Sequence, residues 1–161
     1  MDTAVPVYAT TLSEYDDFFA RYAVTFEQSL SGRFNADAIR SFYAEYFVSI
    51  SENGPVRGSK NDGSFVHSVR KAHEFYRQVG MRALHIEAIA VLHIHDGHDR
   101  VRVSYVAHHR RQDGTPVDLP FDVTYLVQKR LGGPRIFGFI AGDEMELYRD
   151  AGLIDDDGKP I

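Results

Sequence analysis

The sequence predicts an α+β protein in which three N-terminal helices pack on a strongly curved, mostly antiparallel sheet and enclose a pocket. Residues 84–141 contain four strand-like runs rich in Val, Ile, Tyr and Phe, which favour a pleated, half-buried surface. Asp96-Gly97, Asp113-Gly114 and Gly132-Gly133-Pro134 separate these runs, and Gly supplies the positive φ that tight turns need. We therefore expect an antiparallel meander, with the helical first half covering one face.

Three helices are expected before the meander. The first begins at a Thr11–Glu14 capping box and ends near Gly32, with apolar residues every three or four positions. Asn35 caps a short second helix. The third begins at Asp62 or Ser64 and ends at Gly80, which is a typical C-terminal signal. Each helix has one apolar stripe, and three stripes are enough to cover one sheet face.

The segments between and after these elements are expected to be irregular, apart from one short strand at 47–51. Residues 52–63 are polar and rich in Gly, which is typical of a surface loop, and we expect a mobile lid over the pocket there. The tail, residues 143–161, is expected to form one helical turn followed by an acidic, mobile end. The whole chain, 1–161, then forms a single domain with a core at about 12–142.

Composition excludes several classes of function. The net charge of −5 argues against a nucleic-acid partner, and the chain has no Cys for disulfides or thiolate chemistry. No apolar run approaches the roughly 20 residues of a membrane helix, so we expect no membrane association. The N-terminus lacks the basic and apolar regions of a signal peptide, which predicts a cytoplasmic location.

A histidine-rich segment, His93 to His98, resembles part of a metallo-hydrolase motif. Gly97 stands where that motif requires an acidic ligand, and Asp96-Gly97 makes a better turn than a metal loop. We therefore expect no metal site. The sequence also lacks GxGxxG and GxSxG patterns, so we expect no nucleotide cofactor and no serine nucleophile.

The order of elements and several local runs resemble the nuclear transport factor 2-like superfamily. Its members include the ketosteroid isomerases, the SnoaL-like polyketide cyclases and the scytalone dehydratases. The resemblance spans about residues 12–142. It is carried by Arg21-Tyr22, Ala38-Ile39 with Phe42-Tyr43-Ala44, Pro120-Phe121-Asp122, Val127-Gln-Lys-Arg130 and Arg135-Ile-Phe-Gly-Phe139. The resemblance implies a cone-shaped fold whose pocket holds a small apolar molecule.

The resemblance also implies catalytic residues. Tyr22 matches the oxyanion-donating tyrosine of the ketosteroid isomerases, and Asp122 matches their protonated aspartate. Burial would raise the pKa of an Asp in this apolar run, so a neutral Asp122 could donate beside Tyr22. The isomerases' catalytic base is missing, because Ser51 stands there with Glu52 next to it. His85 matches a catalytic histidine of the scytalone dehydratases and is the expected proton acceptor.

The position of Asp122 relative to His85 depends on the turns. If Asp96-Gly97 is a two-residue turn, His85 lies opposite His108. A second two-residue turn at 113–114 then puts Asp122 on the other face from His85, whereas a three-residue loop with a bulge puts them together. Both registers remain open. The residues expected to line the pocket are Phe18, Phe26, Tyr46, Tyr76, Tyr105 and Leu126.

Three functions fit these observations. The first is a cofactor-free isomerase, cyclase or dehydratase that acts by acid–base chemistry on a small apolar molecule. The second is a non-catalytic binder of such a molecule. The third is an assembly subunit similar to the small subunit of ring-hydroxylating dioxygenases. The long strands carry apolar residues on both faces, so we also expect a homodimer through the outer face. A fold does not choose between these functions, because function depends on the site.

Overall fold

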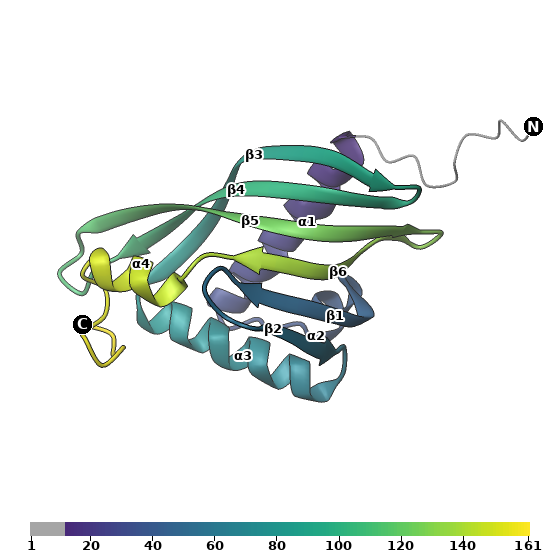
Figure 1. Ribbon diagram of the computed structural model, residues 1–161. Coiled ribbons are helices and arrows are strands. Elements are labelled where there is room, and N and C mark those ends of the chain that lie inside the picture. The colour runs from purple at the N-terminus through teal and green to yellow at the C-terminus, as the bar shows by residue number, and fades with distance from the viewer. Residues whose placement is uncertain (1–11) are drawn as a thin grey trace, which may run out of the picture.

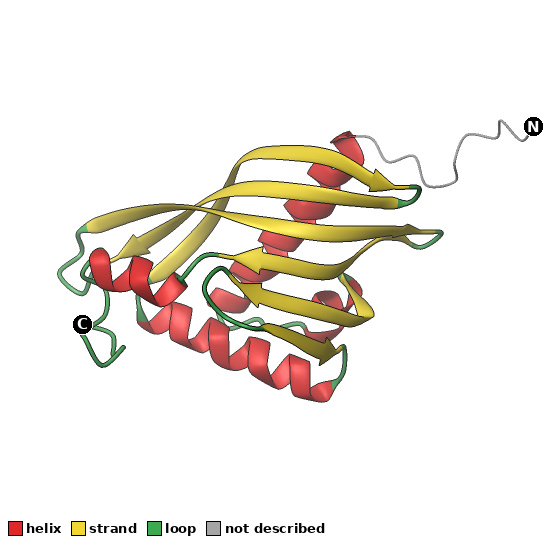
Figure 2. Ribbon diagram, viewed as in Figure 1, coloured by secondary structure: helices red, strands yellow, loops and turns green. Residues whose placement is uncertain are grey.

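A computed structural model describes residues 12–161 and has the expected α+β architecture (Figures 1 and 2). A six-stranded, mostly antiparallel sheet is covered on one face by helices (Figure 2). In chain order the elements are α1 (Leu12–Leu30), α2 (Ala36–Ser41), β1 (Tyr43–Ser51), β2 (Val56–Lys60), α3 (Gly63–Gln78), β3 (Met81–His95), β4 (His98–Arg110), β5 (Pro116–Arg130), β6 (Gly133–Ala141) and α4 (Glu144–Asp150).

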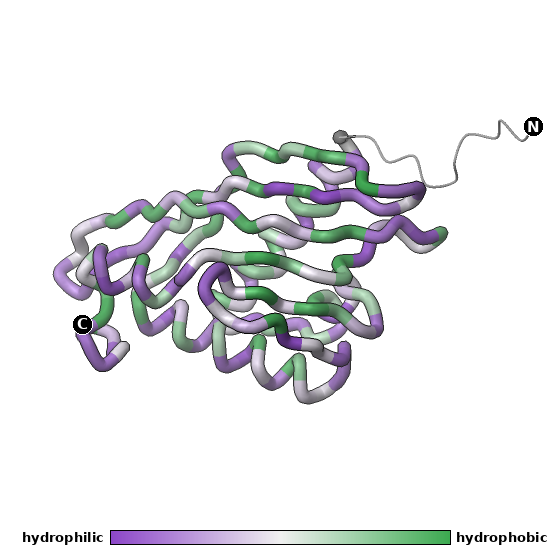
Figure 3. The backbone as a smooth tube through the Cα atoms, viewed as in Figure 1, coloured by the Kyte–Doolittle hydropathy of each residue, from purple (hydrophilic) through white to green (hydrophobic). Residues whose placement is uncertain are grey.

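The sheet has the strand order β2-β1-β6-β5-β4-β3. The four strands β3 to β6 form the predicted antiparallel meander, and β1 joins β6 in parallel. Figure 1 shows α1 crossing behind the long strands and α3 running along the β1–β2 side. Apolar and polar residues alternate along β4 (Figure 3), so one face of this strand is buried and the other is exposed.

The helix boundaries follow the expected local signals. The Asn35 side chain accepts a hydrogen bond from the Ala38 amide, and the Asp62 side chain accepts from the Ser64 amide, each at 3.0 Å. Gly80 follows α3 with a φ of +89°, and a Cβ there would lie 2.1 Å from the Arg110 carbonyl oxygen, so only Gly fits. The capping box expected at Thr11 lies outside the described residues.

The core forms where α1 packs on the inner face of β4 and β5. Phe18 packs edge-to-face on Phe19 and Phe42, with ring centroids 5.0 and 5.4 Å apart. The strand residues that meet this helix are fully or nearly fully buried: Val101, Val103, Tyr105, Tyr125 and Val127. All five have odd numbers, so the even-numbered residues of β4 and β5 face away from the helices.

Residues 52–63 do not form the expected irregular loop. β2 (Val56–Lys60) pairs with β1 as an antiparallel hairpin, with Ile50 opposite Val56 and Tyr46 opposite Lys60. β2 contains only one apolar side chain, Val56, which gave a weak strand signal, whereas the glycines gave a strong loop signal. The expectation of a loop over this whole segment is therefore wrong.

Bulges set the register of the meander. The pairing of β3 with β4 shifts at three places, so His85 lies opposite Val106 and the predicted His85–His108 pairing is wrong. Each bulge adds one residue to one strand and moves the following side chains to the other face. β4 and β5 pair from Arg110–Pro116 onward without a shift, which puts Asp122 opposite Ser104.

The C-terminal tail packs against the domain instead of forming a free acidic end. Tyr148, Leu153 and Ile154 are almost completely buried. The Arg111 guanidinium donates to the carbonyl oxygens of Ala151 and Gly152 at 2.5 and 2.9 Å. The acidic composition of residues 155–157 is typical of a solvated end, so these contacts could not be predicted from the sequence. The expectation of a mobile tail is wrong, and α4 is held firmly at one end of the sheet (Figure 1).

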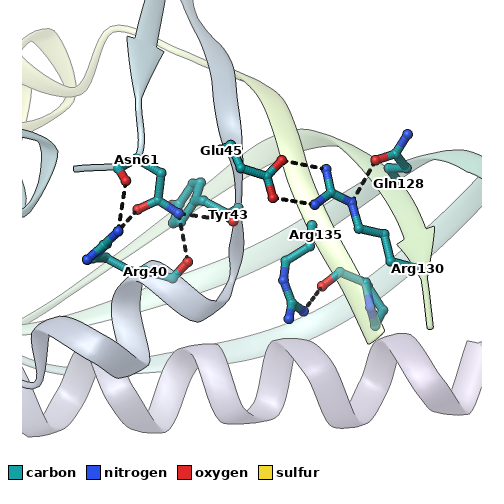
Figure 4. A network of polar contacts seen from close by, with 8 residues as sticks. Arg40, Tyr43, Glu45, Asn61, Gln128, Arg130 and Arg135 are labelled. Carbon is teal, nitrogen blue, oxygen red and sulfur yellow. Dashed lines mark hydrogen bonds and ion pairs between the residues drawn. The ribbon is translucent and has the colours of Figure 1, made fainter. Parts of the chain in front are cut away.

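A polar network fixes the start of β1 between α2 and the sheet (Figure 4). The Asn61 side-chain amide donates to the carbonyl oxygens of Arg40 and Tyr43, at 2.9 and 3.1 Å. Arg130 on β5 forms a bidentate ion pair with Glu45, at 2.6 and 3.0 Å. These contacts lie on either side of Tyr43 in the sequence, and they hold the backbone that directs its ring inward.

Candidate functional site: an aromatic cavity

A cavity of about 650 Å³ lies between the helices and the inner face of the sheet. Its volume is within the usual range for small-molecule sites, roughly 300–1,000 Å³. Residues from α1, α2, α3, α4 and the strands line it. Eleven lining side chains are aromatic: Tyr22, Phe26, Phe42, Tyr43, Phe65, Tyr76, Tyr105, Phe121, Tyr125, Phe139 and Tyr148.

Four tyrosine hydroxyls form two pairs along this wall. The Tyr22 and Tyr43 hydroxyls lie 3.2 Å apart, and those of Tyr105 and Tyr125 lie 2.8 Å apart. Burial raises the pKa of all four phenols, so they stay protonated near neutral pH. Within each pair one hydroxyl donates its hydrogen to the oxygen of the other. The accepting hydroxyl can then donate its own hydrogen to another acceptor. The array can therefore donate a hydrogen bond to an oxygen of a ligand.

The Glu144 carboxylate lies at the α4 end of the cavity. Tyr76 donates to Glu144 Oε2 at 3.0 Å, and Tyr148 donates to Oε1 at 3.1 Å. The residue is exposed on the whole, but the two tyrosines cover part of its carboxylate, and this desolvation raises the pKa of Glu144 despite the two hydrogen bonds. It forms no ion pair with a Lys or Arg of residues 12–161. A carboxyl group with a raised pKa is suited to proton transfer near neutral pH.

His73 is the other titratable group in the wall. Its Nδ1 lies 2.5 Å from Ser29 Oγ, and its ring packs against both Phe26 and Tyr76, with centroid distances of 4.5 and 5.9 Å. Desolvation lowers the pKa of His73 to about 4, so the imidazole is neutral at physiological pH. Tyr76 also donates to Glu144, so His73 and Glu144 both contact this tyrosine.

Tyr22 lines the cavity, but Asp122 does not take the expected place beside it. The Asp122 carboxylate accepts hydrogen bonds from Arg102, and its side chain is 39% exposed on the outer face of the sheet. The guanidinium lowers the pKa of Asp122. The prediction of a buried, neutral Asp122 is wrong, because the register opposite Ser104 turns this residue away from the helices.

His85 also lies on the outer face. It is exposed, stands opposite Val106, and its ring centroid is 6.4 Å from that of His108. Asp122 and His85 thus share one face, as one of the two open registers requires, but this face points away from the helices. Asp122 contributes to the edge of the cavity lining, and His85 does not. The expected role of His85 as a proton acceptor in the pocket is contradicted by this position.

Three of the six expected lining residues lie in the cavity wall: Phe26, Tyr76 and Tyr105. Phe18 is buried in the core beneath the wall. Tyr46 is 69% exposed, and Leu126 lies on the outer face opposite Arg100. The prediction that these last two residues line the pocket is wrong, because both side chains point away from the helices.

Only a local capping pattern in the sequence pointed to Glu144. Asp143 is an N-cap residue whose side chain accepts from the Glu146 amide, and Tyr148 follows Glu144 at the helical spacing of four. Reading residues 143–161 as a free tail concealed this signal. Within residues 12–161, no group of three or more His, Asp or Glu side chains could hold a metal ion, and no helix there is long and apolar enough to cross a membrane.

Comparison with known proteins agrees with this fold. A family model described as NTF2-like protein (DUF6841) matches residues 13–144. No curated protein sequence matches the chain. One similar solved structure is an NTF2-like protein with a cystatin-like fold from Novosphingobium aromaticivorans, which is 13% identical with a TM-score of 0.62. The match covers 81% of this chain and 79% of that one.

Two further solved structures are similar at low identity. A ketosteroid isomerase-like protein from Erwinia carotovora atroseptica is 13% identical, with a TM-score of 0.55 over 81% of this chain and 94% of that one. A protein of Novosphingobium aromaticivorans, assigned as the beta subunit of an aromatic-ring-hydroxylating dioxygenase, is 15% identical, with a TM-score of 0.56 over 80% and 86%. At such identities the likeness concerns the fold alone.

Proposed function

The chain belongs to the NTF2-like family DUF6841, and we propose that its cavity binds a small, largely apolar molecule and converts it by cofactor-independent acid–base chemistry. The reaction class is isomerisation, cyclisation or dehydration. The aromatic wall holds the apolar skeleton, Glu144 accepts a proton, and the tyrosine hydroxyls stabilise the oxygen on which negative charge develops.

The single observation that supports this proposal is the Glu144 carboxylate, which two tyrosines hold at the edge of an aromatic cavity. A purely structural carboxylate at such a place would be expected to have a cationic partner. Glu144 has only tyrosine partners, and desolvation raises its pKa toward the range in which proton transfer is efficient. A ligand in the cavity is the group that completes this arrangement.

The test begins with native mass spectrometry of the purified protein, which identifies a co-purifying ligand. Incorporation of solvent deuterium into that ligand in D₂O then reports proton transfer. We expect incorporation with the wild type and its loss in Glu144→Gln, which keeps the shape of the side chain. Glu146→Gln is the matched control, because Glu146 is exposed on the same helix and lies outside the cavity lining. Binding without any exchange in the wild type would favour a non-catalytic binder.

We also propose a homodimer through the outer sheet face. Exposed apolar side chains lie there on neighbouring strands, among them Tyr46, Val56 and Ile140. The fold likeness to a dioxygenase beta subunit makes assembly with another chain the alternative. Sedimentation of the purified chain at micromolar concentration distinguishes a homodimer from assembly with another chain. A monomer in this measurement would rule out the homodimer. Tyr46→Glu should weaken the dimer by placing charge in the contact.

A further inference from the structure

The charges around the cavity are all of one sign. No Lys or Arg occurs among the lining residues within the described part of the chain. Four carboxylates do occur there: Glu52, Asp122, Asp143 and Glu144. Arg102 neutralises Asp122 on the outer face, and the lowered pKa of His73 keeps that imidazole uncharged. The other three lining carboxylates have no positive side chain among the lining residues to compensate them, so the cavity is electronegative.

The uncompensated carboxylates lie at the opening. Glu52, Gly142, Asp143 and Glu144 are the exposed residues where β1, β6 and α4 meet at the cavity rim. Glu52 is tied to this corner by its amide, which donates to the Ala141 carbonyl oxygen at 2.8 Å. Its Oε2 would lie 3.4 Å from a Cβ on Gly142. Glu52 and Glu144 thus flank the same glycine, and neither forms an ion pair with a described Lys or Arg.

Aromatic rings lie directly inside this opening. Tyr76 and Tyr148, which hold Glu144, have centroids 6.4 Å apart, and Phe26 stacks on Tyr76 at 5.6 Å. The faces of aromatic rings attract cations, and the attraction increases where water is excluded. An acidic rim would not by itself define a site. Here it surrounds the entrance to an aromatic cavity of about 650 Å³.

We propose that the ligand of this cavity carries a protonated or quaternary nitrogen on an otherwise apolar skeleton. The nitrogen lies at the opening beside Glu52 and the ring faces, and the skeleton extends inward to the tyrosine array. This inference rests on the proposed function, since it presumes that the cavity is a ligand site. A positive charge beside the rim also favours the ionised form of Glu144, which keeps it able to accept a proton.

The experiment compares three probes of matched size that differ in charge. They are 3-phenylpropyl-trimethylammonium, its neutral carbon isostere (4,4-dimethylpentyl)benzene, and 4-phenylbutyrate. Each displaces the neutral fluorescent dye N-phenyl-1-naphthylamine from the full-length protein. We expect the cation to displace the dye at a concentration roughly tenfold lower than the neutral probe, with the anion weakest. The preference should shrink at 1 M salt, because salt screens charges at the opening.

Substitutions show which side chain causes the preference for the cationic probe. Glu52→Gln should reduce the advantage of the cation over the neutral probe and leave binding of the neutral probe unchanged. Glu74→Gln is the matched control, because Glu74 is exposed on α3 and lies outside the lining. Equal displacement by all three probes, or stronger displacement by the anion, would overturn the inference and leave the proposed function standing. Failure of the dye itself to bind would overturn both.

Discussion

Two carboxylates lie at opposite ends of the long strands, and both accept hydrogen bonds from tyrosines. Near the β3–β4 turn, Asp99 is 2% exposed and accepts from the Tyr15 hydroxyl at 2.5 Å and from His93 Nδ1. At the other end, Glu144 on α4 accepts from Tyr76 and Tyr148. A histidine of the chain completes the Asp99 cluster, whereas the Glu144 cluster adjoins the cavity.

The difference indicates which buried polar groups are structural. Asp99 is held by a tyrosine and an imidazole of the chain, and it is absent from the cavity lining. Glu144 has no cationic partner among the described residues, and its pKa is raised by desolvation. A satisfied carboxylate stabilises a fold, whereas a carboxylate that is desolvated at a cavity and lacks a cationic partner is available to a ligand.

The largest expected effect is on stability at the Asp99 end. Asp99→Ala leaves the buried Tyr15 hydroxyl and His93 without their shared acceptor, and we expect a loss of about 3 kcal/mol in the free energy of unfolding. Asp118→Ala is the control, since Asp118 pairs with His108 in an exposed position and should cost less than about 1 kcal/mol. Urea denaturation measures both values. Equal losses would show that Asp99 is not the structural anchor.

The next effect concerns the buried imidazole of the cavity wall. The pKa of His73 is lowered from 6.5 to about 4, so the folded state binds fewer protons than the unfolded state between these values. Stability should fall as the pH drops from 6.5 to 4, by about 3 kcal/mol in all. Thermal or urea unfolding across this range should show a shallower fall in His73→Phe than in the wild type. Identical pH dependence in the two proteins would contradict the assignment.

A smaller effect of opposite sign is expected at Glu144. Its folded-state pKa is raised, so the folded state binds more protons, and stability should fall as the pH rises from the ordinary pKa of Glu through the raised value. Glu144→Gln removes this fall, so above that range the variant should be as stable as the wild type or more stable. Glu146→Gln should follow the wild-type pH profile. Clear destabilisation by Glu144→Gln at neutral pH would show that Glu144, like Asp99, is a structural carboxylate.

The smallest expected effect is on the pH dependence of ligand conversion. Tyr76→Phe removes one of the two hydrogen bonds that favour the ionised Glu144 carboxylate, so its pKa should rise further. The acid limb of the pH–rate profile should move to higher pH. Tyr15→Phe removes the corresponding hydroxyl at the Asp99 end, and it should leave that profile unchanged while costing about 1 kcal/mol of stability.

The sequence predicted the architecture because the signals for it are local. Turn glycines, helix caps and apolar periodicity each act within a few residues, and the meander and three helices followed from them. The face that carries Asp122 could not be predicted in the same way, because it depends on the five-residue connection between Arg110 and Pro116. Bulges in β3 likewise decide the face of His85, and nothing in its neighbouring residues marks them.

The cavity was predicted more completely than its chemistry. Tyr22, Phe26, Tyr76 and Tyr105 could be found because they lie on helical stripes or alternating strand positions that face the core. Glu144 could not, because its importance comes from contacts with Tyr76, 68 residues away. The acidic tail that contains it has the composition of a solvated end, and only the long-range packing of Leu153 and Ile154 brings it to the cavity.

The most direct test of the cavity as the ligand site is dye binding to two variants of matched size. Ala72 lies in the cavity wall, whereas Ala88 is exposed on the outer face opposite Ser104. We predict saturable binding of N-phenyl-1-naphthylamine, one per chain, to the wild type and to Ala88→Phe, and its loss in folded Ala72→Phe. Retained binding in Ala72→Phe, or loss in folded Ala88→Phe alone, would contradict the account and place the ligand site outside the cavity.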